Sequence, residues 1–174
     1  MFDSIVLINY CHPECVPLFN IMRLPKTEAF RLAGELASKH PHTTAFYRFA
    51  DFDNYYALRE SQDKYLHTRF IEIGGLPEEE HPLSFVVEGS DYLRDWFGGG
   101  VETMLPLKSI LPCHISFTLG DSGAVFQKHG DVELLTLEDF RQLFTEYDGE
   151  IKALLSHTGY HYVEAQLWND IYIK

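Results

Sequence analysis

The chain has 174 residues, of which 45% are hydrophobic and 14% aromatic, and its formal net charge is −12. This composition excludes a wholly disordered chain and predicts one globular domain over residues 1–174 with a sizeable core. The negative charge repels a phosphate backbone, so it disfavours general nucleic-acid binding and suits a basic protein partner better.

The first residues and the cysteines indicate in which compartment of the cell the protein is expected. The early segment lacks the charged, apolar and small-residue pattern of a signal peptide, and no apolar run approaches the ~20 residues that span a bilayer. Three cysteines are an odd number and do not make a disulfide framework. We therefore expect a cytoplasmic protein that does not enter the membrane.

Hydrophobic periodicity and turn residues predict strands and helices that mix without the strict alternation of parallel βαβ units. The expected helices cover residues 28–39, from Asp51 or Asp53 to about 73, 90–97, 136–147 and 151–155. The expected strands cover residues 4–10, 43–49, 83–87, 101–107, 114–119, 124–127 and 160–168. This order predicts an α+β fold in one domain, with a mixed or mainly antiparallel sheet and three to five helices.

A Gly-Asp-Ser-Gly sequence at residues 120–123 lies between two of these expected strands. Because Gly and Asp suit tight turns, we interpret it as a hairpin turn. The four residues also resemble the nucleophile signature of chymotrypsin-type serine proteases and, with Phe117 before them, that of GDSL-type esterases. Either resemblance implies a hydrolase with Ser122 as the nucleophile. The early histidines lie in no matching context and the C-terminus has no Asp-x-x-His, so the turn is preferred.

Cys11, His12 and Cys15 place possible metal ligands close together. A structural zinc site takes four ligands, usually as two separated pairs, and a second Cys/His pair at such spacing is missing. The adjacent Cys113 and His114 do not have that spacing. We therefore predict no metal site, although the sequence leaves metal binding at Cys11, His12 and Cys15 open.

Two late strands carry polar side chains on one face, because strand side chains alternate between faces. On the last strand, Tyr160, Tyr162, Glu164, Gln166 and Trp168 share one face. On the strand at 114–119, His114, Ser116 and Thr118 alternate with apolar residues. Such faces either line a site, meet a partner or cover a sheet.

Arg48 on an expected early strand, Ser-Phe-Thr at 116–118 and Glu164 on the last strand follow one another along the chain. This order resembles the arginine–serine–glutamate order of ADP-ribosyltransferases. The resemblance implies that Arg48 holds nicotinamide adenine dinucleotide (NAD), that Ser116 shapes the pocket and that Glu164 stabilises a cationic transition state. The chain departs from the family, whose middle motif is normally Ser-Thr-Ser and which has an acid or Gln where Tyr162 stands.

A second resemblance covers much of residues 81–174. The segments HPLSFVVEGSDYLRDWF, HISFTLGDS and YVEAQLWND resemble stretches of an uncharacterised bacterial protein family with no assigned activity. This resemblance implies a shared fold and brings no chemistry.

Two function hypotheses follow. The preferred one is an acidic protein-binding module, because the composition resembles that of small bacterial immunity proteins, which neutralise toxins by binding them. Its ligand- or partner-binding residues would be Tyr162, Gln166, Trp168, His114 and Thr118. The alternative is an NAD-dependent enzyme with Arg48, Ser116 and Glu164 as catalytic residues. NAD is the only cofactor or cosubstrate that either hypothesis specifies, and neither specifies an oligomeric state.

Overall fold

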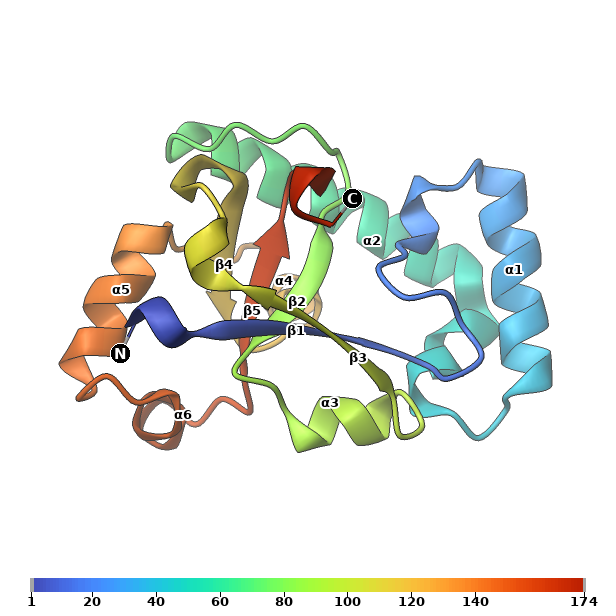
Figure 1. Ribbon diagram of the computed structural model, residues 1–174. Helices are drawn as coiled ribbons and strands as arrows, with labels where there is room; N and C mark the ends of the chain where they lie inside the picture. The colour runs from blue at the N-terminus through green and yellow to red at the C-terminus, as the bar shows by residue number, and fades with distance from the viewer. Residues whose placement is uncertain (1, 174) are drawn as a thin grey trace.

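A computed structural model describes residues 2–173 and shows a five-stranded sheet (Figure 1). The strand order is β3-β1-β2-β5-β4, and every neighbouring pair is antiparallel. The strands are β1 (Val6–Cys11), β2 (Leu83–Val87), β3 (Val101–Pro106), β4 (Ile115–Leu119) and β5 (Val163–Leu167). The α+β class and the antiparallel sheet are therefore confirmed.

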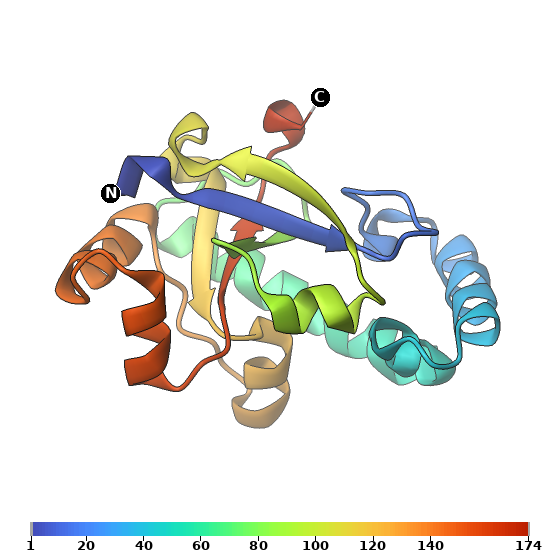
Figure 2. The same cartoon turned by 60° about the horizontal axis from the view of Figure 1, so that its bottom comes forward.

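Six α-helices accompany the sheet within residues 2–173, where three to five were expected. They are α1 (Lys26–Lys39), α2 (Phe52–Glu72), α3 (Asp91–Trp96), α4 (Ser122–His129), α5 (Leu137–Glu146) and α6 (Ile151–Thr158). Figure 1 and Figure 2 both place α1 beyond one end of β1, with α5 and α6 beyond the other. No helix in this described part of the chain has both the length and the apolar character needed to cross a membrane.

One face of the sheet carries the main hydrophobic core. Side chains from all five strands pack there against α5 and α6. The Phe117 ring of β4 stacks on the Phe140 ring of α5 at 4.4 Å between centroids. A capping box formed by Thr136 and Asp139 fixes the start of α5. Burial of this apolar face is the main contribution to the stability of the sheet.

The opposite face of the sheet is covered partly by α2. Near the C-terminal end of α2, the Phe70 ring stacks on the buried Trp168 ring at 5.4 Å between centroids. Val125 and Phe126 of α4 also contact this cluster. The N-terminal half of α2 instead packs against α1, around Phe52. This helix therefore bridges the sheet and the N-terminal helical region.

Residues 43–49 were expected to form a strand, and that prediction is wrong. Thr44–Asp51 is a 3₁₀ helix, η3. Phe46 and Phe49 are three residues apart, which places them on one side of a 3₁₀ turn, and their rings stack at 5.5 Å between centroids. Phe49 also packs edge-on against Phe52 of α2. These contacts outweigh the alternation that favoured a strand, so Arg48 lies on a helical turn.

Residues 124–127 were also expected to form a strand, whereas they belong to α4. The Asp121 carboxylate accepts hydrogen bonds from the amides of Gly123 and Ala124, which caps the helix. Gly130 ends the helix in the left-handed conformation. The Gly-Asp-Ser-Gly sequence therefore joins a strand to a helix, and the hairpin-turn prediction is wrong.

Candidate active site

A cavity of about 620 Å³ opens on the α2 side of the sheet. Residues of β1, β2 and β5 line it together with residues of α2, α3, η3 and the turn before α4. Its volume falls in the range typical of sites for small molecules. Its walls are rich in aromatic side chains, including Phe46, Phe49, Tyr92, Trp96, Phe97 and Tyr162.

Glu164 of β5 presents its carboxylate to this cavity. Its Oε1 accepts a hydrogen bond of 2.9 Å from the Ser84 hydroxyl, and its Oε2 accepts one of 2.9 Å from the Ser122 amide. Within residues 2–173 no cationic side chain forms an ion pair with it. The carboxylate is thus held in a fixed position while its charge is left uncompensated by an ion pair.

The acidity of Glu164 follows from these surroundings. Burial raises the pKa of its carboxyl group, and the nearby Asp121 carboxylate raises it further. Hydrogen bonds from Ser122 and Ser84 lower it in part, so the pKa stays above its ordinary value of 4.5. A carboxyl group of this kind exchanges its proton closer to neutral pH than an exposed glutamate does, which is a property of acid–base groups in active sites.

The Gly-Asp-Ser-Gly turn surrounds this carboxylate. Gly120 has φ of +76°, and a Cβ atom there would lie 2.6 Å from the Tyr160 ring. A Cβ atom on Gly123 would lie 3.0 Å from the Gln62 side chain. Both glycines therefore allow close approach, while Asp121 caps the helix and Ser122 contacts Glu164.

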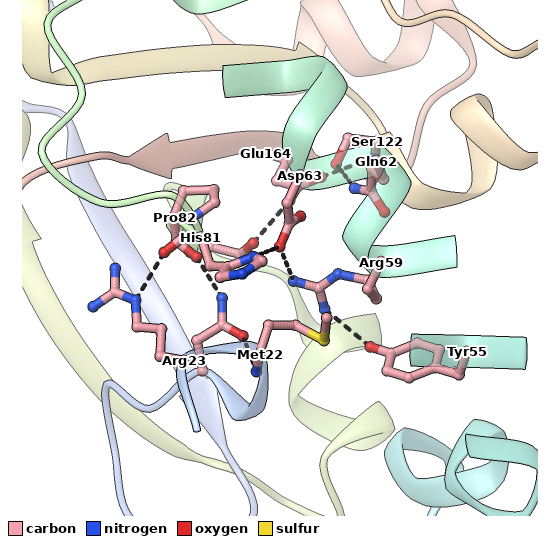
Figure 3. A network of polar contacts seen from close by, with 12 residues as sticks. Met22, Arg23, Tyr55, Arg59, Gln62, Asp63, His81, Pro82, Ser122 and Glu164 are labelled. Carbon is pink, nitrogen blue, oxygen red and sulfur yellow. Dashed lines mark hydrogen bonds and ion pairs between the residues drawn. The ribbon is translucent and has the colours of Figure 1, made fainter. Parts of the chain in front are cut away.

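A polar network on α2 forms one wall of the cavity (Figure 3). The buried Asp63 carboxylate pairs with His81 Nδ1 at 2.7 Å and accepts a hydrogen bond of 3.4 Å from Arg59. Arg59 also donates to the Tyr55 hydroxyl at 3.0 Å. Burial lowers the pKa of Arg59, but Tyr55, Asp63 and the more distant Glu164 together raise it by more, so the guanidinium keeps its charge. These contacts fix Arg59 beside the cavity.

Arg48, although it lies on η3 and not on a strand, lines the same cavity as Glu164. Within the described residues no side chain forms an ion pair with it. Tyr162 lies near both. Burial raises the pKa of its hydroxyl, nearby carboxylates raise it further, and the Arg48 guanidinium lowers it. The structure therefore brings Arg48, Tyr162 and Glu164 around one cavity, which the buried Gln166 also lines.

Ser116 does not join them. Its side chain is fully buried, donates to Gln166 Oε1 at 2.9 Å and accepts from Trp168 Nε1 at 2.8 Å. Gln166 in turn donates to the Thr118 hydroxyl at 3.0 Å. This hydrogen-bonded set lies on the same sheet face as Glu164. Ser116, Thr118 and Trp168 are not among the residues that line the cavity.

His114 lies near the opposite end of β4 from the Gly-Asp-Ser-Gly turn, where its Nδ1 contacts the Tyr172 hydroxyl at 2.7 Å.

Cys11, His12 and Cys15 line the cavity, and burial raises the pKa of the Cys11 and Cys15 thiols. Within residues 2–173, no three His, Cys, Asp or Glu side chains are arranged to hold a metal ion.

The sequence interpretation did not single out Ser84, Arg59, Gln62 or Asp63. The one signal for Ser84 in the sequence was its position as a polar residue within the apolar stretch Leu-Ser-Phe-Val-Val.

Comparisons with protein-family models, with curated proteins and with solved structures give no match for this chain.

Proposed function

We propose that this protein is an enzyme that acts on a small molecule in the cavity, with Glu164 as its catalytic carboxylate. The observation that carries the proposal is the state of Glu164. Two donors hold it in place, it forms no ion pair within residues 2–173, and its pKa is raised. A carboxylate held in a concave, largely aromatic site stabilises positive charge that develops on a substrate.

This chemistry suits cleavage of a bond to a sugar carbon, which gains positive charge as the leaving group departs. NAD is the first substrate to test, because Arg48 and Glu164 line one cavity and a guanidinium is well suited to a phosphate. Its nicotinamide leaves as a neutral molecule, so bond cleavage needs no acid; water then bonds to the sugar carbon and passes its proton to Glu164. Ser116 is buried away from the cavity, and we assign the pocket-shaping role to Ser84 and Ser122, which contact Glu164.

The test is nicotinamide release from NAD by the wild type and by Glu164→Gln. We expect the variant to lose roughly 10²–10³-fold in kcat, the usual effect of removing one group that stabilises transition-state charge. Arg48→Gln should raise KM more than it lowers kcat. Glu133→Gln, at an exposed position outside the cavity, is the matched control. An inactive wild type, or equal rates for the wild type and Glu164→Gln, would contradict the NAD proposal.

A protein-binding module is the second candidate. Val16, Phe19 and Tyr92 line the cavity and are 72%, 46% and 49% exposed, so part of its lining is apolar surface open to solvent. The net charge of −12 suits a basic partner. Trp168 and Tyr162, two of the expected partner contacts, are 0% and 8% exposed and do not offer surface anchors.

Native mass spectrometry of proteins captured from the source cell tests this candidate, with the Val16→Asp variant as the comparison. Capture of the same proteins by both forms would count against it.

A further inference from the structure

Gln62 lies in the middle of α2 and connects this helix to the turn that holds Glu164. Its side chain is buried, and its Nε2 donates a hydrogen bond of 2.9 Å to the Ser122 hydroxyl oxygen, which is buried as well (Figure 3). Sixty residues separate the two along the chain. The contact therefore depends on how α2 is placed across the sheet.

Ser122 acts on Glu164 through two groups. Its amide donates to Oε2 at 2.9 Å, and its hydroxyl also lowers the pKa of this carboxyl group. A serine hydroxyl has one proton to donate. Because the Ser122 oxygen accepts from Gln62, that proton is left free to point toward Glu164. The resulting chain runs from Gln62 through Ser122 to Glu164.

We propose that Gln62 is a positioning residue that orients the Ser122 hydroxyl toward Glu164 and so stabilises the ionised carboxylate. Its importance for catalysis rests on the function proposed above, whereas its effect on the titration of Glu164 does not. The neighbouring Gly123 supports the arrangement, because a Cβ atom there would lie 3.0 Å from Gln62 Oε1. A larger residue at that position would push the amide away from Ser122.

Two substitutions of Gln62 separate this role from mere packing. Leucine fills similar space but donates no hydrogen bond, so the Ser122 hydroxyl loses its fixed orientation. Glutamate keeps the shape, but its carboxylate accepts the Ser122 proton and reverses the direction of the chain. It also adds a negative charge near Glu164. Both changes disfavour the ionised form of Glu164, and glutamate does so more strongly.

Other charged and titratable groups line the cavity together with Glu164, and none of them is altered in these variants. They come from α2, η3, α3, the turn before α4 and the residue before β5, and they are Arg59, Asp63, Arg48, Tyr92, Asp121 and Tyr162. A change in the titration of Glu164 in Gln62→Leu, which adds no charge, is then assigned to the chain through Ser122.

The experiment follows the side-chain carboxyl carbon of Glu164 by NMR over a pH series. We expect its titration midpoint to move upward in Gln62→Leu and further upward in Gln62→Glu. Gln142→Leu, an exposed position on α5 at the other face of the sheet, should leave it unchanged. A midpoint in Gln62→Leu equal to that of the wild type would overturn the proposal.

Ser122→Ala provides a second test, which also applies if a Gln62 variant folds poorly. It removes the hydroxyl but keeps the amide that donates to Glu164. This single substitution should raise the titration midpoint of Glu164. Adding Gln62→Glu should then move the midpoint less than the same change moves it in the wild-type background, because the hydroxyl route is already absent. Equal shifts in the two backgrounds would contradict action through Ser122. Since no substrate is used, a protein inactive on NAD leaves this result standing.

Discussion

The amide of Ser122 donates a hydrogen bond of 2.9 Å to Glu164 Oε2, which joins the first turn of α4 to the start of β5. A helix N-terminus carries partial positive charge and favours a carboxylate. Asp121, the cap of the same helix, has the opposite effect and raises the pKa of Glu164. One short turn therefore both holds the carboxylate and limits how readily it ionises.

The first prediction concerns stability against pH. Folding raises the pKa of Glu164 above its ordinary value of 4.5, so folding favours its protonated form. Its contribution to the free energy of unfolding is complete below pH 4.5 and is lost as the pH rises through the higher folded pKa. Glu164→Gln does not ionise, so we expect it to be more stable than the wild type at pH 8, with the difference vanishing near pH 4.

Urea unfolding of both proteins at several pH values measures this difference. Glu133→Gln is the control, because the exposed Glu133 lies outside the cavity. A difference between Glu164→Gln and the wild type that stays constant from pH 4 to pH 8 would show that folding does not perturb this carboxyl group.

The second prediction separates two serines near the sheet. Ser116→Ala leaves the buried Trp168 Nε1 without an acceptor, and we expect it to lower the free energy of unfolding by about 1–3 kcal/mol. Ser84 is exposed and bonds to Glu164, so Ser84→Ala should change stability by less than about 0.5 kcal/mol. It should instead raise the titration midpoint of Glu164. If Ser116→Ala instead raised the titration midpoint of Glu164 and Ser84→Ala lowered the stability, Ser116 and not Ser84 would belong to the site.

The third prediction concerns the α2 network. Asp63 is 1% exposed between Arg59 and His81, so Asp63→Asn leaves the Arg59 charge without its buried partner. We expect a loss of about 3–5 kcal/mol in the free energy of unfolding. The Asp91 side chain is 88% exposed, so Asp91→Asn, which breaks its ion pair with Arg94, should cost about 0–1 kcal/mol. Similar costs for the two variants would mean that the network contributes little.

Local signals in the sequence predicted much of the fold. The strand expected at 83–87 matches β2, because its apolar run ends at turn residues. The helices expected after Ser90 and Thr136 begin there, since both side chains cap their helices. The misassigned segment 43–49 depends on Phe46 and Phe49 contacting other aromatic rings, which no local pattern records.

The site was predicted less completely, for a related reason. Alternation along β4 and β5 predicted a polar face on each strand, and the antiparallel register places Ser116 and Glu164 on one side of the sheet. Alternation does not say which element covers each part of the face. Trp168 and Gln166 close over Ser116, whereas Glu164 is left facing the cavity. Gln62 could not be predicted, because its partner lies sixty residues further along the chain.

The last prediction tests the turn that carries Ser122. Gly120 and Gly130 have similar φ values, +76° and +74°, so alanine at either position adopts the same unfavourable backbone conformation. We expect Gly130→Ala to cost about 1–2 kcal/mol, because nothing lies within 4 Å of its new Cβ atom. At Gly120 the Cβ atom would lie 2.6 Å from the Tyr160 ring, so that ring must move or the cost must rise further.

Urea unfolding in two backgrounds separates these effects. In the wild-type background, Gly120→Ala should cost about 1 kcal/mol more than Gly130→Ala, the lower end of what overpacking costs. In a Tyr160→Ala background the ring is absent, and the two alanine substitutions should cost the same. Tyr160 also lines the cavity, so the same contact sets the position of the cavity wall beside Glu164. An extra cost at Gly120 that persists without the Tyr160 ring would show that strain elsewhere in the turn, and not this contact, requires glycine.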